Sequence, residues 1–213
     1  MSVRFVDVEQ NSPEWFSARS GIITASSFEC LITPTGKQAS GKKIDDLANK
    51  IIAELVTKDS EDKDSYKGYW TERGHELEPD AAFVYGVIHE VEPIVCGFAV
   101  NDRLKAGCSP DRLIGDVGMV QIKCPAAKEH IKYLLADTCP DDHKPQVQGE
   151  LLVCEREWND LMSYHPHQDI PPAILRCYRD EPYLIVLSRA IKEFNEIVEE
   201  KLETLKEKGI YYV

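Results

Sequence analysis

Residues 108–125, CSPDRLIGDVGMVQIKCP, decide how the rest of this chain is arranged. A Pro-Asp step ends one apolar run, a Gly-Asp-Val-Gly turn follows, and a second apolar run stops at a proline. We expect two strands joined by a tight turn, which places Asp111 near Gln121 and Lys123. Because alternate residues of a strand point to the same face of a sheet, Gln121 and Lys123 share one side of the hairpin.

An acid, a second oxygen ligand and a lysine on one rim are typical of a hydrolase site that holds a divalent metal. Phosphodiester hydrolysis needs an activated water and neutralisation of the phosphate charge, and Mg²⁺ supplies both when carboxylate, carbonyl and water oxygens hold it. Asp111, residue 121, the backbone carbonyl of Ile122 and Lys123 have these chemical types. The motif is short and loose, so these residues alone leave open a β-hairpin with incidental polar side chains.

Length and composition predict one cytoplasmic domain that spans residues 1–213. The formal net charge of −12 argues against a surface that wraps nucleic acid as a whole, but it allows a local basic groove. Seven cysteines without a C-x-x-C pair indicate reduced thiols, not a disulfide framework or a zinc site. The first residues lack the apolar segment of a signal peptide, and no apolar run approaches the roughly 18 residues of a membrane span.

The apolar periodicity predicts an α/β domain with helices, then a mixed sheet that has the hairpin at its centre, then helices again. The expected helices cover residues 12–19, 24–32, 44–56, 70–84, 126–136 and 145–155, and a long final helix begins at the capping residue Asp180. Within residues 70–84, Gly74 and Pro79 mark either turns or a point where the helix starts again. The expected strands cover residues 87–92, 94–100, 104–108, 119–123, 160–165 and 173–178, and residues 58–68 are charged and turn-like.

Other polar residues could extend the site at the hairpin. Glu78 lies on an acidic helix that either reaches the site or presents a solvated face. Gln146 and Gln148 are either site residues or surface amides.

A second group of residues has the chemistry of phosphate binding. Arg19 and Ser26 flank a connection into a helix N-terminus, where free N–H groups and the helix dipole favour anions. The basic loop at residues 33–43 is either a solvated loop or a further phosphate contact.

Taken together, these segments resemble the phage lambda exonuclease family, the YqaJ-type viral recombinases, within the PD-(D/E)-x-K nuclease superfamily. The resemblance is carried by residues 15–26 (WFSARSGIITAS), 74–78 (GHELE), 108–111 (CSPD), 121–125 (QIKCP) and 146–148 (QVQ), in order and with matching spacing over nearly the whole chain. It implies a restriction-endonuclease-like core, in which a central mixed β-sheet is flanked by helices.

The resemblance also implies roles for individual residues. Asp111 and residue 121 match metal ligands, and the Ile122 carbonyl would be a further one. Lys123 matches the catalytic lysine. The remaining matches are Glu78 for the helix glutamate that supports the metals or water, Gln148 for the glutamine near the lysine and the scissile phosphate, and Arg19, Ser26 and Ser109 for the 5′-phosphate site, with Lys128 as a further phosphate-binding cation across a one-residue gap.

Members of this family degrade one strand of duplex DNA from a 5′ end and leave a 3′ single-stranded tail. The resemblance therefore implies Mg²⁺ as cofactor, with Mn²⁺ as an alternative and two ions in an active form. It also implies a ring-shaped homotrimer on double-stranded DNA ends that carry a 5′-phosphate, working beside a single-strand annealing recombinase. A non-catalytic DNA-end-binding module of the same fold and a site-specific endonuclease are the competing hypotheses.

Position 121 departs from the family pattern, because Gln121 stands where the family has Glu. An amide oxygen can ligate Mg²⁺, but the lost charge removes several kcal/mol of short-range attraction at intermediate dielectric, on the order of 4 kcal/mol. Three explanations are open: an introduced Glu→Gln change, which the match of the surrounding residues favours, a naturally weakened enzyme, or compensation by another acid such as Glu78 or Asp116. We therefore expect an exonuclease that is weakened or inactivated at this position.

Overall fold

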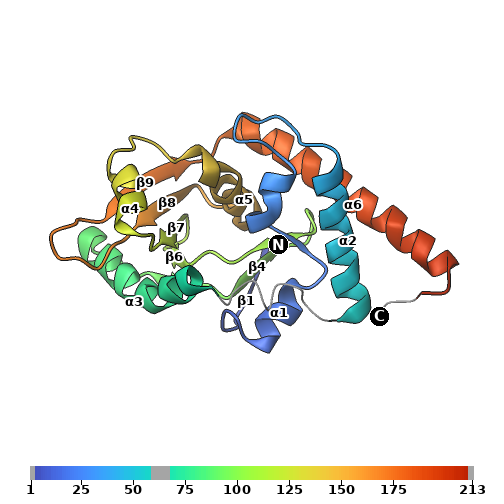
Figure 1. Cartoon of the computed structure of the whole chain (residues 1–213), viewed down its shortest axis with the longest axis horizontal. Helices are drawn as coiled ribbons and strands as arrows, with labels where there is room; N and C mark the ends of the chain where they lie inside the picture. The colour runs from blue at the N-terminus through green and yellow to red at the C-terminus, as the bar shows by residue number, and fades with distance from the viewer. Residues whose placement is uncertain (1–2, 59–67, 211–213) are drawn as a thin grey trace.

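The hairpin at the centre of the sequence forms as expected in the computed structural model, which describes residues 3–58 and 68–210 (Figure 1). Most of the charged turn expected over residues 58–68 lies outside these residues. The hairpin belongs to a five-stranded sheet of order β3-β6-β7-β8-β9. Its strands are β3 (Ile94–Val95), β6 (Arg112–Ile114), β7 (Gly118–Lys123), β8 (Trp158–Ser163) and β9 (Ala173–Tyr178).

The register of the hairpin places Asp111 opposite Gln121. β6 pairs antiparallel with β7, with Arg112 opposite Val120, and this register continues to Asp111 opposite Gln121. Gly115 turns the chain with a φ of 52°, a conformation that glycine adopts without a steric cost. β7 and β8 pair in parallel, so the chain between them has to cross over the sheet.

A second sheet of four strands, in the order β1-β4-β5-β2, leads into the hairpin. Its strands are β1 (Val3–Val6), β4 (Phe98–Asn101), β5 (Ala106–Cys108) and β2 (Ile23–Thr24). β5 ends at Cys108, so Ser109 and Asp111 follow at the junction of the two sheets.

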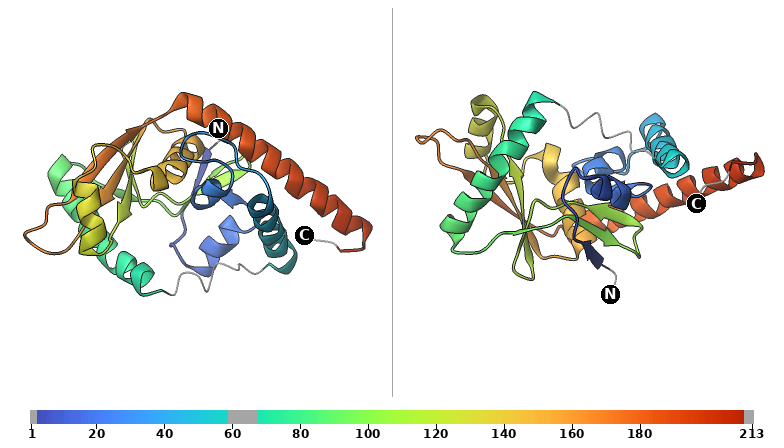
Figure 2. Two further views of the ribbon diagram at one scale, coloured as in Figure 1. Left: turned by 45° about the horizontal axis from the view of Figure 1, so that its top comes forward. Right: turned by 90° about the horizontal axis from the view of Figure 1, so that it is seen from below.

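Helices cover both faces of the five-stranded sheet. The helical segments are α1 (Pro13–Arg19), the 3₁₀ helix η1 (Ala25–Cys30), α2 (Lys42–Thr57), α3 (Tyr69–His89), α4 (Ala127–Leu134), the 3₁₀ helix η3 (Asp141–His143), α5 (Lys144–Cys154) and α6 (Glu181–Glu207). The two views in Figure 2 show α6 running past the sheets, and its apolar side packs with α2 in the main core. The side chains of Ser12 and Asp180 cap α1 and α6 as expected, accepting hydrogen bonds from the backbone N–H groups of Trp15 and Tyr183.

Alternation along β7 decides which residues reach the site. Val120 and Ile122 pack with Ala81 and Tyr85 of α3 on one face of the sheet. Met119 packs with the α5 core on the other face. Because side chains alternate along a strand, Gln121 and Lys123 lie on the α5 side with Met119.

Several expected boundaries are wrong. The strand expected at residues 87–92 is absent, because α3 continues through Pro79 to His89, held by the burial of Ala81 and Tyr85. The helix expected at residues 24–32 is the end of β2 followed by a short 3₁₀ helix, and residues 94–100 divide between β3 and β4 of different sheets. β1 was not expected. The fold class is confirmed: mixed sheets flanked by helices.

No helix in residues 3–58 and 68–210 has both the length and the apolar character needed to cross a membrane.

An ion pair with a buried carboxylate fixes β9 against β8 and α3. Asp160, which is 1% exposed, accepts two hydrogen bonds of 2.8 Å from Arg176 and one of 2.6 Å from the Tyr85 hydroxyl. We expect Asp160→Ala to lower the free energy of unfolding by about 2 kcal/mol, because it leaves the buried Tyr85 hydroxyl without its acceptor and removes the ion pair with the partly exposed Arg176. Denaturant titration measures this change.

The exposed pair between Arg4 and Asp102 is the matched control. It has the same two-bond geometry at 2.8 Å, but its side chains are 59% and 51% exposed. Asp102→Ala should cost less than about 1 kcal/mol. Equal losses in the two variants would contradict the role given to burial.

Candidate active site

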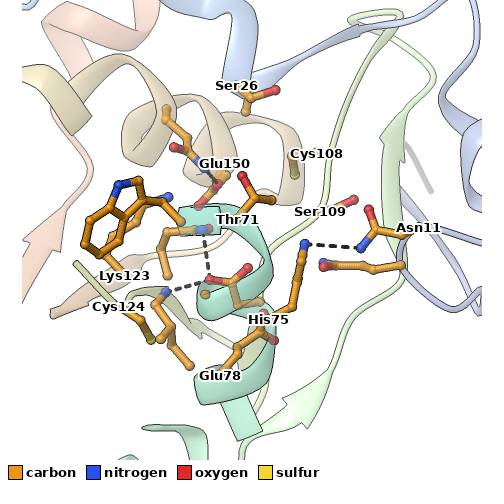
Figure 3. A pocket seen from close by; sticks show the side chains of 18 of the residues that line it. Asn11, Ser26, Thr71, His75, Glu78, Cys108, Ser109, Lys123, Cys124 and Glu150 are labelled. Carbon is orange, nitrogen blue, oxygen red and sulfur yellow. Dashed lines mark hydrogen bonds between the residues drawn. The ribbon is translucent and has the colours of Figure 1, made fainter. Parts of the chain in front are cut away.

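A cavity of about 780 Å³ opens on the side of β7 that faces α5 (Figure 3). Its walls come from α1, η1, α3, the β5–β6 junction, β7, α4 and α5. Its lining includes eight of the residues to which the family resemblance assigns a role: Arg19, Ser26, Glu78, Ser109, Asp111, Gln121, Ile122 and Lys123. Segments far apart in the sequence therefore meet at one site.

The carboxylate of Asp111 is fixed by two donors from β7. Its Oδ2 accepts hydrogen bonds from the Gln121 side-chain amide at 2.8 Å and from the backbone N–H of Ile122 at 2.6 Å. A glutamate at position 121 would put a second negative charge against this oxygen. Gln121 therefore replaces like-charge repulsion by a hydrogen bond in the metal-free protein.

The same amide leaves an oxygen without a partner. Gln121 is 5% exposed, and its Oε1 is a buried atom with no hydrogen-bond partner among the residues that the structure describes. An unsatisfied buried acceptor costs about 1–3 kcal/mol. A cation at the cavity wall would satisfy this oxygen, so Asp111 and Gln121 fit a divalent metal. The described residues contain no group of three or more His, Cys, Asp or Glu side chains placed to hold a metal, which agrees with an amide at position 121.

Glu78 reaches the cavity from α3, but it is paired. Its Oε1 lies 2.5 Å from Arg112 Nη1, and the same guanidinium nitrogen donates to the Asp111 carbonyl at 2.5 Å. Glu78 thus braces the hairpin through Arg112. Asp116, the other acid considered as compensation, is exposed in the β6–β7 turn and does not line the cavity.

Gln148 was expected to lie near Lys123 in the site, but its side chain does not line the cavity. The Gln148 amide donates to the Tyr178 carbonyl at 2.8 Å, and its oxygen accepts from the Asp180 N–H at 2.9 Å, so this side chain ties α5 to the start of α6. Gln146 and Glu150 line the cavity instead. They are four residues apart and share one helix face, whereas a residue two positions away points to a different side.

A wall of the cavity that carries a guanidinium and two hydroxyl groups lies beside Asp111 and Gln121. Trp15 Nε1 donates to Ser109 Oγ at 2.9 Å and to the Gly97 carbonyl at 3.2 Å. The Arg19 guanidinium lies over the Trp15 ring, 4.2 Å from its centroid, and Arg19 Nη2 donates to Thr24 Oγ1 at 3.4 Å. These contacts hold Arg19 and Ser109 at one wall together with the exposed Ser26. Trp15 was not identified from the sequence as the residue that positions Arg19 and Ser109, although Trp15 lies within the segment that carries the family resemblance.

Lys128 does not belong to this wall. It is exposed on α4 and does not line the cavity, whereas its neighbour Glu129 does. The basic loop at residues 33–43 also lies outside the cavity lining. Lys123 is the cation on the β7 side of the site, and it is half-buried.

Two carboxyl groups of the cavity hold protons more tightly than usual. Burial, followed by the negative charge of Glu78, raises the pKa of Asp111 to about 7, against the opposing effect of Lys123. Burial, followed by the charge of Asp111, raises the pKa of Glu150 to about 8. Glu150 therefore lies within electrostatic range of Asp111.

The fold is a nuclease fold. Its cavity combines the Asp111 carboxylate, the Lys123 side chain two residues after Gln121, and a wall that carries Arg19 and Ser109. The model of the YqaJ-like viral recombinase domain matches residues 14–157, which include all of these residues, so the chain belongs to this family. The family resemblance expected from the sequence is confirmed. No match was found among the curated proteins.

Solved structures of exonucleases share the fold. The alkaline exonuclease LHK-Exo from Laribacter hongkongensis is 26% identical, with 93% of this chain and 98% of that chain covered and a TM-score of 0.81. A structure of LHK-Exo in complex with dAMP is 26% identical with the same coverage and a TM-score of 0.80. A phage-related exonuclease from Haemophilus somnus is 12% identical over 86% of this chain and 96% of that chain, with a TM-score of 0.65, and shows the fold alone.

The raised pKa values of Asp111 and Glu150 predict a pH dependence of the metal-free protein. Between about pH 4 and pH 8 the folded protein retains protons that the unfolded chain has released. These two groups therefore add stability below about pH 4, and this contribution is lost as the pH rises to 8. Denaturant titrations in EDTA should show a smaller free energy of unfolding at pH 8 than at pH 5.

The comparison variant is Asp111→Asn with Glu150→Gln, whose amides do not titrate. It should lose less stability over the same range than the parent. A parent that gains stability relative to this variant as the pH rises would contradict the assignment.

Proposed function

We propose that this chain is a metal-dependent 5′→3′ exonuclease, a deoxyribonuclease that degrades one strand of linear double-stranded DNA and leaves 3′ single-stranded tails for recombination. The observation that carries the proposal is that Asp111, Gln121 and Lys123 share one cavity with Arg19 and Ser109. Membership of the YqaJ-like family and the similarity to the alkaline exonuclease LHK-Exo support it. So does the LHK-Exo complex with dAMP, because a deoxynucleoside monophosphate is the product of such a reaction.

The residues divide into a hydrolytic side and an end-binding side. Mg²⁺, or Mn²⁺ in its place, bound as two ions in the active form, would supply the activated water and neutralise the phosphate charge. Asp111, Gln121 Oε1 and the Ile122 carbonyl would hold it. The Lys123 side chain would orient the attacking water through its ammonium N–H groups, or, as the neutral amine, would help to remove the proton of that water.

At the end-binding side, Arg19 and the hydroxyls of Ser26 and Ser109 receive the 5′-phosphate of the DNA end. The stacking of Arg19 on Trp15 and the hydrogen bond from Trp15 to Ser109 set two of these groups before substrate binds. Gln148 and Lys128 are left out of this proposal because neither lines the cavity.

We place the reaction in a homotrimer that acts beside a single-strand annealing recombinase of phage type. Apolar side chains exposed on α3 and on the edge strand β3, among them Phe83 and Val95 at 72% and 65% exposure, support an assembly surface. The free cysteines support a reducing compartment, the cytoplasm. The whole chain, residues 1–213, would form one nuclease domain.

A non-catalytic DNA-end-binding module is the second candidate, and Gln121 is the observation that favours it. With an amide at this position and Glu78 paired to Arg112, Asp111 has the only carboxylate without an ion pair that the described residues place on the hairpin side of the site. We propose that the chain retains hydrolysis in a weakened form.

A linear duplex with labelled ends tests polarity. With Mg²⁺ and limiting enzyme, mononucleotides should leave from the 5′-phosphorylated end, while a label at the 3′ end of the same strand stays on a shrinking strand. Arg19→Ala should slow digestion of 5′-phosphorylated ends by about tenfold or more, because a charged hydrogen bond to phosphate is lost, and it should affect 5′-hydroxyl ends less.

Arg103→Ala is the control for this substitution, because Arg103 is 74% exposed and pairs with Glu155 away from the cavity. Release from the 3′ end, or equal loss on both kinds of end, would contradict the proposed polarity or end site.

Restoring the acid at position 121 tests the weakened hydrolysis. Gln121→Glu should raise the Mg²⁺-dependent cleavage rate by about tenfold or more, because it adds a negative charge to the metal site. The same variant should melt at a lower temperature in EDTA, where the new carboxylate meets Asp111 without a cation. Cleavage rates that do not differ between parent and variant would refute the weakening at this position, and absence of cleavage in both would favour the end-binding module.

A further inference from the structure

Glu150 is a buried acid that the hairpin motif does not include. It projects from α5 into the cavity that contains Asp111 and Gln121, and it is 1% exposed (Figure 3). Neither Glu150 nor Asp111 takes part in an ion pair among the described residues, in contrast to the Glu78–Arg112 pair. Burial of an unpaired carboxylate is costly, so two of them in one cavity call for a cation.

Glu150 and Gln121 line the same cavity from two different elements, α5 and β7. Gln121 lies on the face of β7 that is turned toward α5, as does Met119, which packs in the same core as Leu151. Gly149 fixes the position of α5, because a Cβ there would lie 2.3 Å from the Phe28 ring of η1. On its other side, the Glu150 carboxylate accepts a hydrogen bond from Asn159 of β8, which pairs with Met119 of β7, so this carboxylate is held against the sheet that carries position 121.

Two side-chain amides orient the Glu150 carboxylate but do not use all of its lone pairs. Glu150 Oε1 accepts from Gln146 Nε2 at 2.9 Å, and Oε2 accepts from Asn159 Nδ2 at 2.7 Å. A carboxylate has about four lone-pair sites, so about two are left for another ligand. Carboxylates that bind metals are commonly held in this way by neighbouring hydrogen bonds.

An independent observation indicates a cation between α5 and β7. The buried Gln121 Oε1 lacks a hydrogen-bond partner among the described residues and lines the same cavity as Glu150. Its nitrogen is used by Asp111, so the oxygen is the part of the amide free to bind a cation.

We propose that Glu150 is a metal ligand of this chain and supplies from α5 the second carboxylate that position 121 lacks on β7. Glu150 would then join Asp111, the amide oxygen of Gln121 and the Ile122 carbonyl in the ligand set. Gln146 and Asn159 would orient Glu150. This assignment rests on the proposed metal-dependent nuclease function.

The other acids near the cavity fit this role less well. Glu78 is paired with Arg112, and Asp116 is exposed in the turn. Glu129 pairs with Lys132 on α4, where both side chains are largely exposed.

The test is Mn²⁺ binding by the full chain without DNA, measured by the electron paramagnetic resonance signal of free Mn²⁺ at one fixed pH. Glu150→Gln should weaken Mn²⁺ binding by about tenfold or more, because it removes a ligand charge. Adding Gln121→Glu to this variant should return the affinity to within about threefold of the parent, because the acid is then supplied from β7. Glu157→Gln, an equal charge change at an exposed position before β8, is the control and should not alter binding.

The fold of each variant is checked by circular dichroism and thermal melting. The buried Asn159 Oδ1 has no partner among the described residues, so a flip of the Asn159 amide can accept the N–H that Glu150→Gln introduces. If this variant does not melt cooperatively, Glu150→Asp, which keeps the charge but draws it back by one methylene, should still weaken Mn²⁺ binding.

Equal Mn²⁺ affinity in the parent and the Glu150 variants would overturn the assignment and leave the nuclease proposal standing. A loss that Gln121→Glu does not rescue would also overturn it, because Glu150 would then act only through packing. A parent that binds no Mn²⁺ would overturn both proposals.

Discussion

The contact between the Asp111 carboxylate and the Gln121 amide, 2.8 Å across the hairpin, is the interaction on which the site depends. It exists because β6 and β7 pair in a register that places these residues opposite each other. The Ile122 N–H bonds the same carboxylate oxygen, so backbone and side chain together aim Asp111 at the cavity. The Gln121 oxygen is buried without a hydrogen-bond partner among the described residues, and in the proposed metal site this oxygen would bind the cation.

Opposite charges are separated within one cavity. Asp111 and Glu150 lie on the side where β7 faces α5, whereas Arg19 is stacked on Trp15 beside Ser109. Such a division suits a substrate phosphate that bridges a metal on one side and fixed cationic and hydroxyl groups on the other. It also explains how a chain with a net charge of −12 can act on DNA, because attraction at the site does not require a basic exterior.

The hairpin could be predicted from the sequence because its signals are local: a glycine turn, two apolar runs and the two-residue alternation that groups Gln121 with Lys123. Glu150 could not, because it is 29 residues beyond Gln121 and reaches it only through the crossover to β8 and the close packing of Gly149 on Phe28. Gln148 was chosen wrongly because the QVQ segment does not reveal which of its two amides faces the site. α3 continues past Pro79 because tertiary packing at Tyr85 outweighs a local signal to stop.

The most direct measurement of the central claim is the anomalous scattering of Mn²⁺ in crystals of this chain. If the cavity beside the hairpin is a divalent-metal centre, a peak should lie within coordination distance of both the Asp111 carboxylate and Gln121 Oε1, on the side of β7 that faces Glu150. A cavity without a peak at saturating Mn²⁺, or peaks only at exposed carboxylates elsewhere, would contradict the account.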